Sequence, residues 1–138
     1  MRVLVLFAPN TRTSAKAQEI IKALAIGIGE QGHTVDVLDA SLDAGARLSA
    51  YDYIAIGTEA TTTFGGKIPA SLAHFFRTAG TISGKRCFAF VTKGGVRKMK
   101  TLQTLMKTME GEGMFLRRSE ILKSADLARV VGKNLQIG

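Results

Sequence analysis

The segment from Tyr51 to Gly95 constrains the fold more than any other part of this 138-residue chain. A strand-like apolar run, YIAIG, opens into a loop of small and hydroxyl residues, and a Gly-Gly pair and a proline then lead into a helix. A second apolar run, CFAFV, opens into another small-residue loop, TKGG. Two parallel strands that each end in such a loop form a crevice suited to a flat, phosphorylated ligand.

The rest of the chain alternates strand-like and helix-like segments. Short apolar runs predict strands over 2–7, 35–38, 53–56 and 86–91, with a fifth, interrupted strand over 114–116 and 121–122. Helical spacing of apolar residues and helix-start signals predict helices over 15–29, 69–78, 96–110 and 124–135. The third of these helices has Met99, Leu102, Leu105, Met106 and Met109 as its expected core stripe.

Such an alternation requires parallel strands joined by right-handed crossovers. We therefore expect a three-layer, doubly wound α/β fold whose five-stranded parallel sheet has the strand order 2-1-3-4-5. The length of the chain predicts that residues 1–138 form one domain. In this strand order the crevice lies at the carboxyl ends of strands one, three and four.

Cysteine usage and hydropathy indicate the compartment. Cys87 is the only cysteine, which excludes an internal disulfide, and its place within an apolar run indicates a buried structural thiol. The apolar runs are too short for a transmembrane helix, and the N-terminal run is typical of a first strand rather than a signal peptide. These features predict a cytoplasmic protein.

The loop after the first expected strand has the composition of a phosphate site. It contains Asn10, Thr11, Arg12, Thr13 and Ser14, and it opens a helix whose N-terminal amide groups attract anions. The three hydroxyl groups add hydrogen-bond donors. The alternative is a polar loop that only caps the helix.

This loop resembles in part the segment with which flavodoxins hold the phosphate of flavin mononucleotide (FMN), a pattern like S-x-T-G-N-T. Thr13 matches the last threonine of that pattern and Ala17 the alanine in the following helix, whereas Ala8, Thr11 and Arg12 replace its serine, glycine and asparagine. The charge of Arg12 is expected to compensate for the lost glycine by attracting the phosphate.

The loop after the third expected strand resembles the flavodoxin family more closely. Its segment GTEATTTFGGKIP is similar to the family pattern G-S-P-T-(aromatic)-G-G-x-P, and Tyr51-Asp52 matches the YD that precedes it. The resemblance implies that this loop approaches the flavin ring with Thr58, Glu59, Ala60, Thr61, Thr62, Phe64, Gly65 and Gly66. Phe64 is its only aromatic residue, and it either faces the ring or packs into the core.

The third loop follows the fourth expected strand and contains Thr92, Lys93, Gly94 and Gly95. Flavodoxins often place a tyrosine here, and they are usually acidic around the flavin. The resemblance implies non-covalent FMN as the cofactor and electron transfer as the function. Positive charges at Lys93 and Arg97 would stabilise the reduced, anionic flavin, which predicts a higher reduction potential than in acidic relatives.

The net charge of +8 is unevenly distributed. Residues 1–76 contain six Lys and Arg against seven Asp and Glu, whereas residues 77–138 contain thirteen against four. The basic half is either a solvated surface or a docking face for an acidic redox partner protein, an anionic membrane surface or nucleic acid. No nucleic-acid module accompanies the charge, so nucleic acid is the weakest of these partners.

Two other functions stay open. An NAD(P)H-dependent flavin or quinone oxidoreductase is one, and a degenerate flavodoxin-like binding module that has lost FMN is the other. The sequence offers no catalytic side chain of its own. His33 and His74 have no metal-ligand spacing with Cys or carboxylate residues, so we expect no metal site.

Overall fold

The computed structural model describes residues 1–9, 13–42, 47–59, 69–78, 82–92 and 98–137. These residues form a five-stranded sheet in the order β2-β1-β3-β4-β5, and all neighbouring strands are parallel. The strands are β1 (Arg2–Ala8), β2 (Thr34–Asp39), β3 (Tyr53–Thr58), β4 (Arg86–Val91) and β5 (Phe115–Ile121). The predicted doubly wound α/β architecture and strand order are confirmed.

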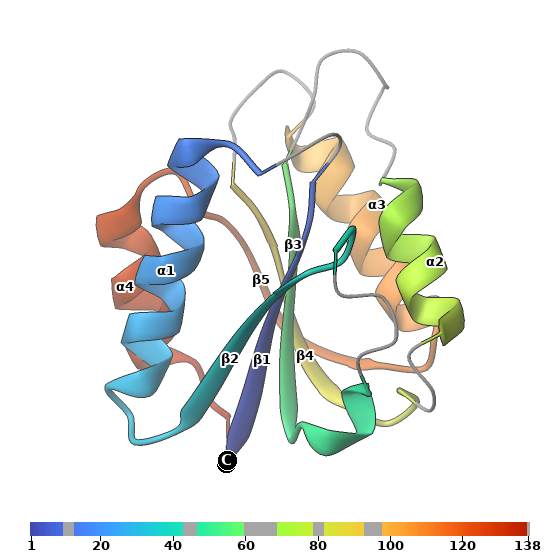
Figure 1. Ribbon diagram of the computed structural model, residues 1–138, viewed down its shortest axis with the longest axis horizontal. Coiled ribbons are helices and arrows are strands. Elements are labelled where there is room, and N and C mark those ends of the chain that lie inside the picture. The colour runs from blue at the N-terminus through green and yellow to red at the C-terminus, as the bar shows by residue number, and fades with distance from the viewer. Residues whose placement is uncertain (10–12, 43–46, 60–68, 79–81, 93–97, 138) are drawn as a thin grey trace.

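Four helices cover the two faces of the sheet, as Figure 1 shows. They are α1 (Ala15–Gly29), α2 (Ala70–Thr78), α3 (Lys98–Gly111) and α4 (Ala125–Asn134). A short 3-10 helix, Leu48–Ala50, precedes β3. Helices α1 and α4 lie side by side on one face, and α2 and α3 cover the other. No helix in the described ranges is long and apolar enough to span a membrane.

The core has two parts because successive strand residues point to opposite faces. On one side Leu4, Ile54 and Cys87 belong to the cluster that packs under α2 and α3. On the other side Val3 and Tyr53 belong to the cluster under α1 and α4. The three central strands are almost completely buried, which explains why their sequences are nearly continuous apolar runs.

Two sequence predictions about the third helix and the fifth strand were wrong. Met99 is 53% exposed, whereas Leu102, Leu105 and Met109 are buried, so the core stripe begins one turn later. The fifth strand is continuous, because one extra residue is absorbed where the register with β4 shifts between Cys87 and Phe88. Such a bulge interrupts the sequence pattern without ending the strand.

Helices α1 and α4 approach each other at two glycines. A methyl group on Gly27 would overlap the backbone carbonyl oxygen of Arg129, and one on Gly132 would lie 2.5 Å from that of Leu24. The two backbones are therefore in direct contact. Only residues without a side chain allow this distance.

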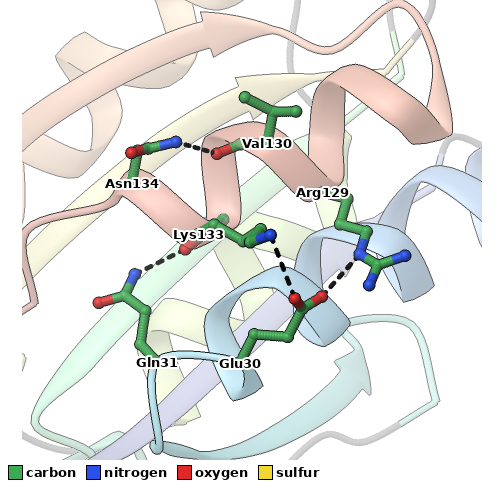
Figure 2. A network of polar contacts seen from close by, with 7 residues as sticks. Glu30, Gln31, Arg129, Val130, Lys133 and Asn134 are labelled. Atoms are coloured by element: carbon green, nitrogen blue, oxygen red, sulfur yellow. Dashed lines mark hydrogen bonds and ion pairs between the residues drawn. The ribbon is translucent and has the colours of Figure 1, made fainter.

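Ion pairs and hydrogen bonds link the same two helices at the C-terminal end of α1, as Figure 2 shows. Glu30 binds Arg129 at 2.6 Å and Lys133 at 3.4 Å. The side chain of Gln31 donates hydrogen bonds to the carbonyl oxygens of Gly132 and Leu135, at 2.7 and 3.0 Å. These bonds fasten the end of α1 to the end of α4.

Candidate functional site

The carboxyl ends of β1, β3 and β4 meet at one edge of the sheet. Ala8 pairs with Thr58 and Thr58 with Val91, so the three strands end at the same level. The hydroxyl of Thr58 donates to the carbonyl oxygen of Ala8 at 2.7 Å, and the amide of Thr92 donates to the carbonyl oxygen of Thr58 at 3.1 Å. This level is the place where the strand order reverses and where ligands bind in doubly wound folds.

Ser14 connects the start of α1 to the end of β3. Its hydroxyl accepts a hydrogen bond from the amide of Ala17 at 3.1 Å, which makes Ser14 the N-cap residue of α1. The same hydroxyl donates to the carboxylate of Glu59 at 3.2 Å. The remaining first-turn amides of α1 have no acceptor within the helix.

A cleft of about 540 Å³ opens over these strand ends. Its lining includes Ser14, Lys16, Ala17, Glu59, Thr92, Lys98 and Lys123. We call it the lysine cleft. Three lysines from three separate segments of the chain line the cleft together with one carboxylate, so the cleft is basic. None of these lysines forms an ion pair within the part of the chain that the structure describes.

Thr92 supplies an unsatisfied donor in the lysine cleft. It is only 2% exposed, and its Oγ1 atom has no hydrogen-bond partner among the described residues. A buried hydroxyl without a partner is costly, by about 1–3 kcal/mol. A ligand or a bound water that accepts or donates a hydrogen bond there would remove this cost.

Comparisons with solved structures show which fold this is. An archaeal flavodoxin has a TM-score of 0.73 and 18% identity to this chain, covering 97% of it and 95% of the flavodoxin. A flavodoxin from Streptococcus pneumoniae TIGR4 has a TM-score of 0.77 and 13% identity, with 98% and 97% covered. Flavodoxin 1 from Bacillus cereus has a TM-score of 0.71 and 17% identity, with 99% and 100% covered. The chain has a flavodoxin-like fold.

No protein-family model matches the sequence, and no curated protein matches it either. The similarity therefore lies in the backbone, over nearly the full length of both chains. At these identities it establishes the flavodoxin-like fold and leaves the ligand to be argued from the side chains.

The structure brings three of the predicted site residues to the lysine cleft, namely Ser14, Glu59 and Thr92. Thr58 lies just below them, with its hydroxyl already bonded to Ala8. Thr13 turns to the neighbouring strand, where its hydroxyl donates to Asp39 at 3.2 Å. The other predicted site residues lie outside the described residues: Asn10, Thr11, Arg12, Ala60, Thr61, Thr62, Phe64, Gly65, Gly66, Lys93, Gly94 and Gly95.

Sequence reasoning did not select Lys16 or Lys123 for the site. Lys16 lies in the first turn of α1, and Lys123 follows β5. An isolated lysine belongs to no sequence motif, so only its position along the chain could have identified it. Residues just after a strand or at the start of a helix reach the carboxyl edge of the sheet in a flavodoxin-like fold.

A larger cavity of about 890 Å³ runs along α1 and the edge strand β2. Its walls are mainly apolar and include Ile21, Ile26 and Val37. Its polar residues are Thr13, Gln18, Lys22, His33 and Asp39, and the hydroxyl of Thr13 is already bonded to Asp39. This cavity lies beside an edge strand rather than over the strand ends where the strand order reverses, so the lysine cleft is the better candidate.

Nucleophilic and metal chemistry find no support in the described residues. Burial raises the pKa of the Cys87 thiol to about 12, which keeps it protonated and inert. The described ranges contain no group of three His, Cys, Asp or Glu side chains that could hold a metal ion. The thiol is completely buried, as its sequence context predicted.

Proposed function

We propose that the lysine cleft binds FMN non-covalently and that the protein is an electron carrier. The observation that carries this proposal is the unpartnered hydroxyl of Thr92 in a basic cleft at the carboxyl edge of a flavodoxin-like sheet. Flavodoxins with a similar backbone are among the structural neighbours of this chain. Chain length, strand order and cleft position support the same assignment.

The side chains present fit such a ligand. Thr92 offers a hydrogen bond to a polar edge of the cofactor, and the first turn of α1 offers amide donors and a positive dipole to a phosphate. Lys16, Lys98 and Lys123 supply the counter-charge. When bound, FMN would supply a ring that accepts and donates electrons.

The contribution of the chain itself is electrostatic and positional. Lysines at the cleft stabilise additional negative charge, so they favour the reduced state of a bound flavin. Glu59 opposes this effect, but its carboxylate is held by Ser14. For the electron acceptor or donor we propose an acidic protein that contacts the basic half of the chain, with binding that weakens steeply as salt is added.

Titration of the purified protein with FMN and with riboflavin tests the assignment. We expect quenching of FMN fluorescence and weaker quenching of riboflavin, which has the ring but no phosphate. A protein that is purified without the yellow colour of flavin and quenches neither compound would overturn the proposal. Equal binding of both compounds would contradict the role given to the lysines and to α1.

The position of Glu59 favours a second candidate, a flavodoxin-like binding module without flavin. Its carboxylate lies 3.2 Å from the hydroxyl of Ser14, at the helix terminus where a phosphate would bind. A negative charge there competes with a phosphate. The Glu59→Gln variant decides between the two candidates: a gain in FMN affinity means that the site accepts the cofactor, and no binding by either protein supports the module.

A further inference from the structure

A second polar pocket lies far from the lysine cleft, between β5, the start of β3 and the end of α4. It has a volume of about 210 Å³ and is lined by Tyr53, Arg117, Arg118, Asn134, Leu135 and Gln136. We call it the arginine pocket. It is smaller than the roughly 300–1,000 Å³ of typical cofactor sites, so it fits a single small group.

The bulge in β5 brings two consecutive arginines to this pocket. Leu116 pairs with Cys87 and Arg118 with Phe88, which makes Arg117 the extra residue. In a regular strand two neighbouring side chains point to opposite faces of the sheet. Bulges redirect a side chain, and here both arginines line one pocket.

Tyr53 adds a hydroxyl group to the arginine pocket. The residue is 1% exposed, and its hydroxyl has no hydrogen-bond partner among the described residues. Buried tyrosines usually find a partner for this group. Burial, with a contribution from Cys87, raises the pKa of Tyr53 to about 12, while the charges of Arg117 and Arg118 act in the opposite direction.

The charge in the pocket is not balanced. Arg118 binds Glu120 at 2.9 Å, whereas Arg117 has no hydrogen-bond or ion-pair partner in the described part of the chain. One guanidinium is therefore in excess. Two cations placed side by side repel each other unless an anion lies between them.

The arginines are not needed to cap α4. The carbonyl oxygens of Gly132 and Leu135 accept hydrogen bonds from Gln31, and that of Val130 accepts one from Asn134 at 2.7 Å. Figure 2 shows Gln31 and Asn134 at this end of the helix. A capping role would leave Arg117 and the Tyr53 hydroxyl unexplained.

We propose that the arginine pocket binds a phosphate group, either as inorganic phosphate or as part of a small phosphate monoester. Guanidinium donors match phosphate oxygens in geometry and charge. Donors that converge from a phenol and two guanidinium groups suit a tetrahedral anion with several acceptor oxygens. The site is separate from the lysine cleft, so the proposal holds whether or not flavin binds there.

Tyrosine fluorescence offers a direct assay. The chain has two tyrosines and no tryptophan, so in the Tyr51→Phe variant Tyr53 is the only strong intrinsic fluorophore. Flavin-free protein is titrated with potassium phosphate, with phenyl phosphate monitored by calorimetry, and with acetate, all at constant ionic strength. We expect saturable binding of phosphate and no saturable binding of acetate.

Two further substitutions distinguish phosphate binding in the arginine pocket from a general effect of the protein's positive charge. Arg117→Gln should weaken phosphate binding about tenfold or more, because a charge-assisted contact is lost. Arg77→Gln removes one exposed charge from α2 on the other face of the sheet and should leave the affinity unchanged. Tighter binding of phenyl phosphate than of phosphate would identify a monoester as the ligand, and equal or weaker binding would identify the free ion.

A linear, unsaturated response to phosphate would overturn the proposal. Equal losses in Arg117→Gln and Arg77→Gln, or acetate binding as tight as phosphate binding, would also overturn it. Unfolding midpoints measured with each anion report on the variants independently of fluorescence, since a ligand of the folded state raises its stability.

Discussion

The two ends of α1 differ in how completely their polar groups are partnered. At the C-terminal end, Glu30 binds two cations of α4 and Gln31 satisfies two of its carbonyl groups. At the N-terminal end, Thr92 has an unpartnered hydroxyl, and three lysines line a cleft without forming ion pairs in the described part of the chain. One end of the helix is bonded to α4, whereas the other lies beside the cleft for which we propose ligand binding.

The stable end depends more on packing than on charge. The ion pairs of Glu30 are largely exposed, and exposed pairs contribute little because water and salt screen them. The contact between Gly27 and Gly132 is buried and leaves no space for a methyl group. The comparison therefore predicts that added side-chain volume at the C-terminal end of α1 lowers the stability of the protein strongly. Substitutions at the N-terminal end should instead change ligand binding.

The largest effect is expected for Gly27→Ala. The new methyl group would overlap the carbonyl oxygen of Arg129, so α1 and α4 must separate, which we expect to lower the free energy of unfolding by about 1–3 kcal/mol. Gly29→Ala is the matched control, because nothing lies within 4 Å of the added atom. It should leave stability unchanged or raise it by up to about 1 kcal/mol. Urea unfolding monitored by circular dichroism measures both, and equal midpoints would contradict the close contact.

Thr92→Val tests the binding end, and its two expected effects have opposite signs. Replacing the unpartnered hydroxyl with a methyl group should raise the free energy of unfolding without flavin by about 1 kcal/mol. The same change should weaken FMN binding, by up to about tenfold for one hydrogen bond. Thr101→Val removes another buried, unpartnered hydroxyl, in α3, outside the lysine cleft. Thr101→Val should therefore stabilise the protein and leave its affinity for FMN unchanged. If both variants lose affinity to a similar extent, Thr92 does not contact the ligand.

Removing one charge from the lysine cleft should change FMN binding less than the Thr92→Val substitution does. Lys98→Gln is expected to weaken FMN binding about two- to fivefold at low salt, as for a partly exposed ion pair, and to lower the reduction potential. Lys107→Gln removes the same charge from an exposed position in the same helix, outside the cleft lining. Fluorescence titrations at two salt concentrations and a redox titration measure the difference. Identical potentials for the two variants would show that the charge of the cleft does not act on the flavin.

The sequence predicted the fold well because the fold depends on a repeated pattern. Continuous apolar runs alternate with helical spacing along the whole chain, so strand order and crossovers follow from general rules. Met99 and the fifth strand were predicted wrongly because a helix start and a one-residue bulge depend on tertiary contacts rather than on periodicity. Ser14, which begins a helix, and Glu59 and Thr92, which directly follow strands, all line the lysine cleft, and their part in binding stays a prediction.

Contacts between distant segments were beyond sequence reasoning. Gly27 and Gly132 touch each other's helices only because α4 returns beside α1 on the same face of the sheet. The run AIGIG at the end of α1 carried a signal, since glycine in a helix is unfavourable unless packing requires it. Arg117 and Arg118 line the same pocket only because of the bulge in β5. No local sequence pattern predicts that bulge.

The smallest effect is expected for the pH dependence of the Glu30 pairs. The hydrogen bond from Arg129, with further help from Lys133, holds the pKa of Glu30 below the ordinary value of 4.5. The folded protein therefore binds this proton less readily than the unfolded chain, so the stabilisation is present above about the ordinary pKa and is lost as the pH falls through the lowered pKa. Glu30→Gln should be slightly less stable than the parent protein at pH 7, and the difference should vanish in acid. Glu112→Gln removes a carboxylate that forms no ion pair in the described ranges, and it should show no such change. A stability difference for Glu30→Gln that stays constant from pH 7 to pH 3 would mean that packing alone holds the two helices together, and that the contrast between the ends of α1 lies in ligand binding only.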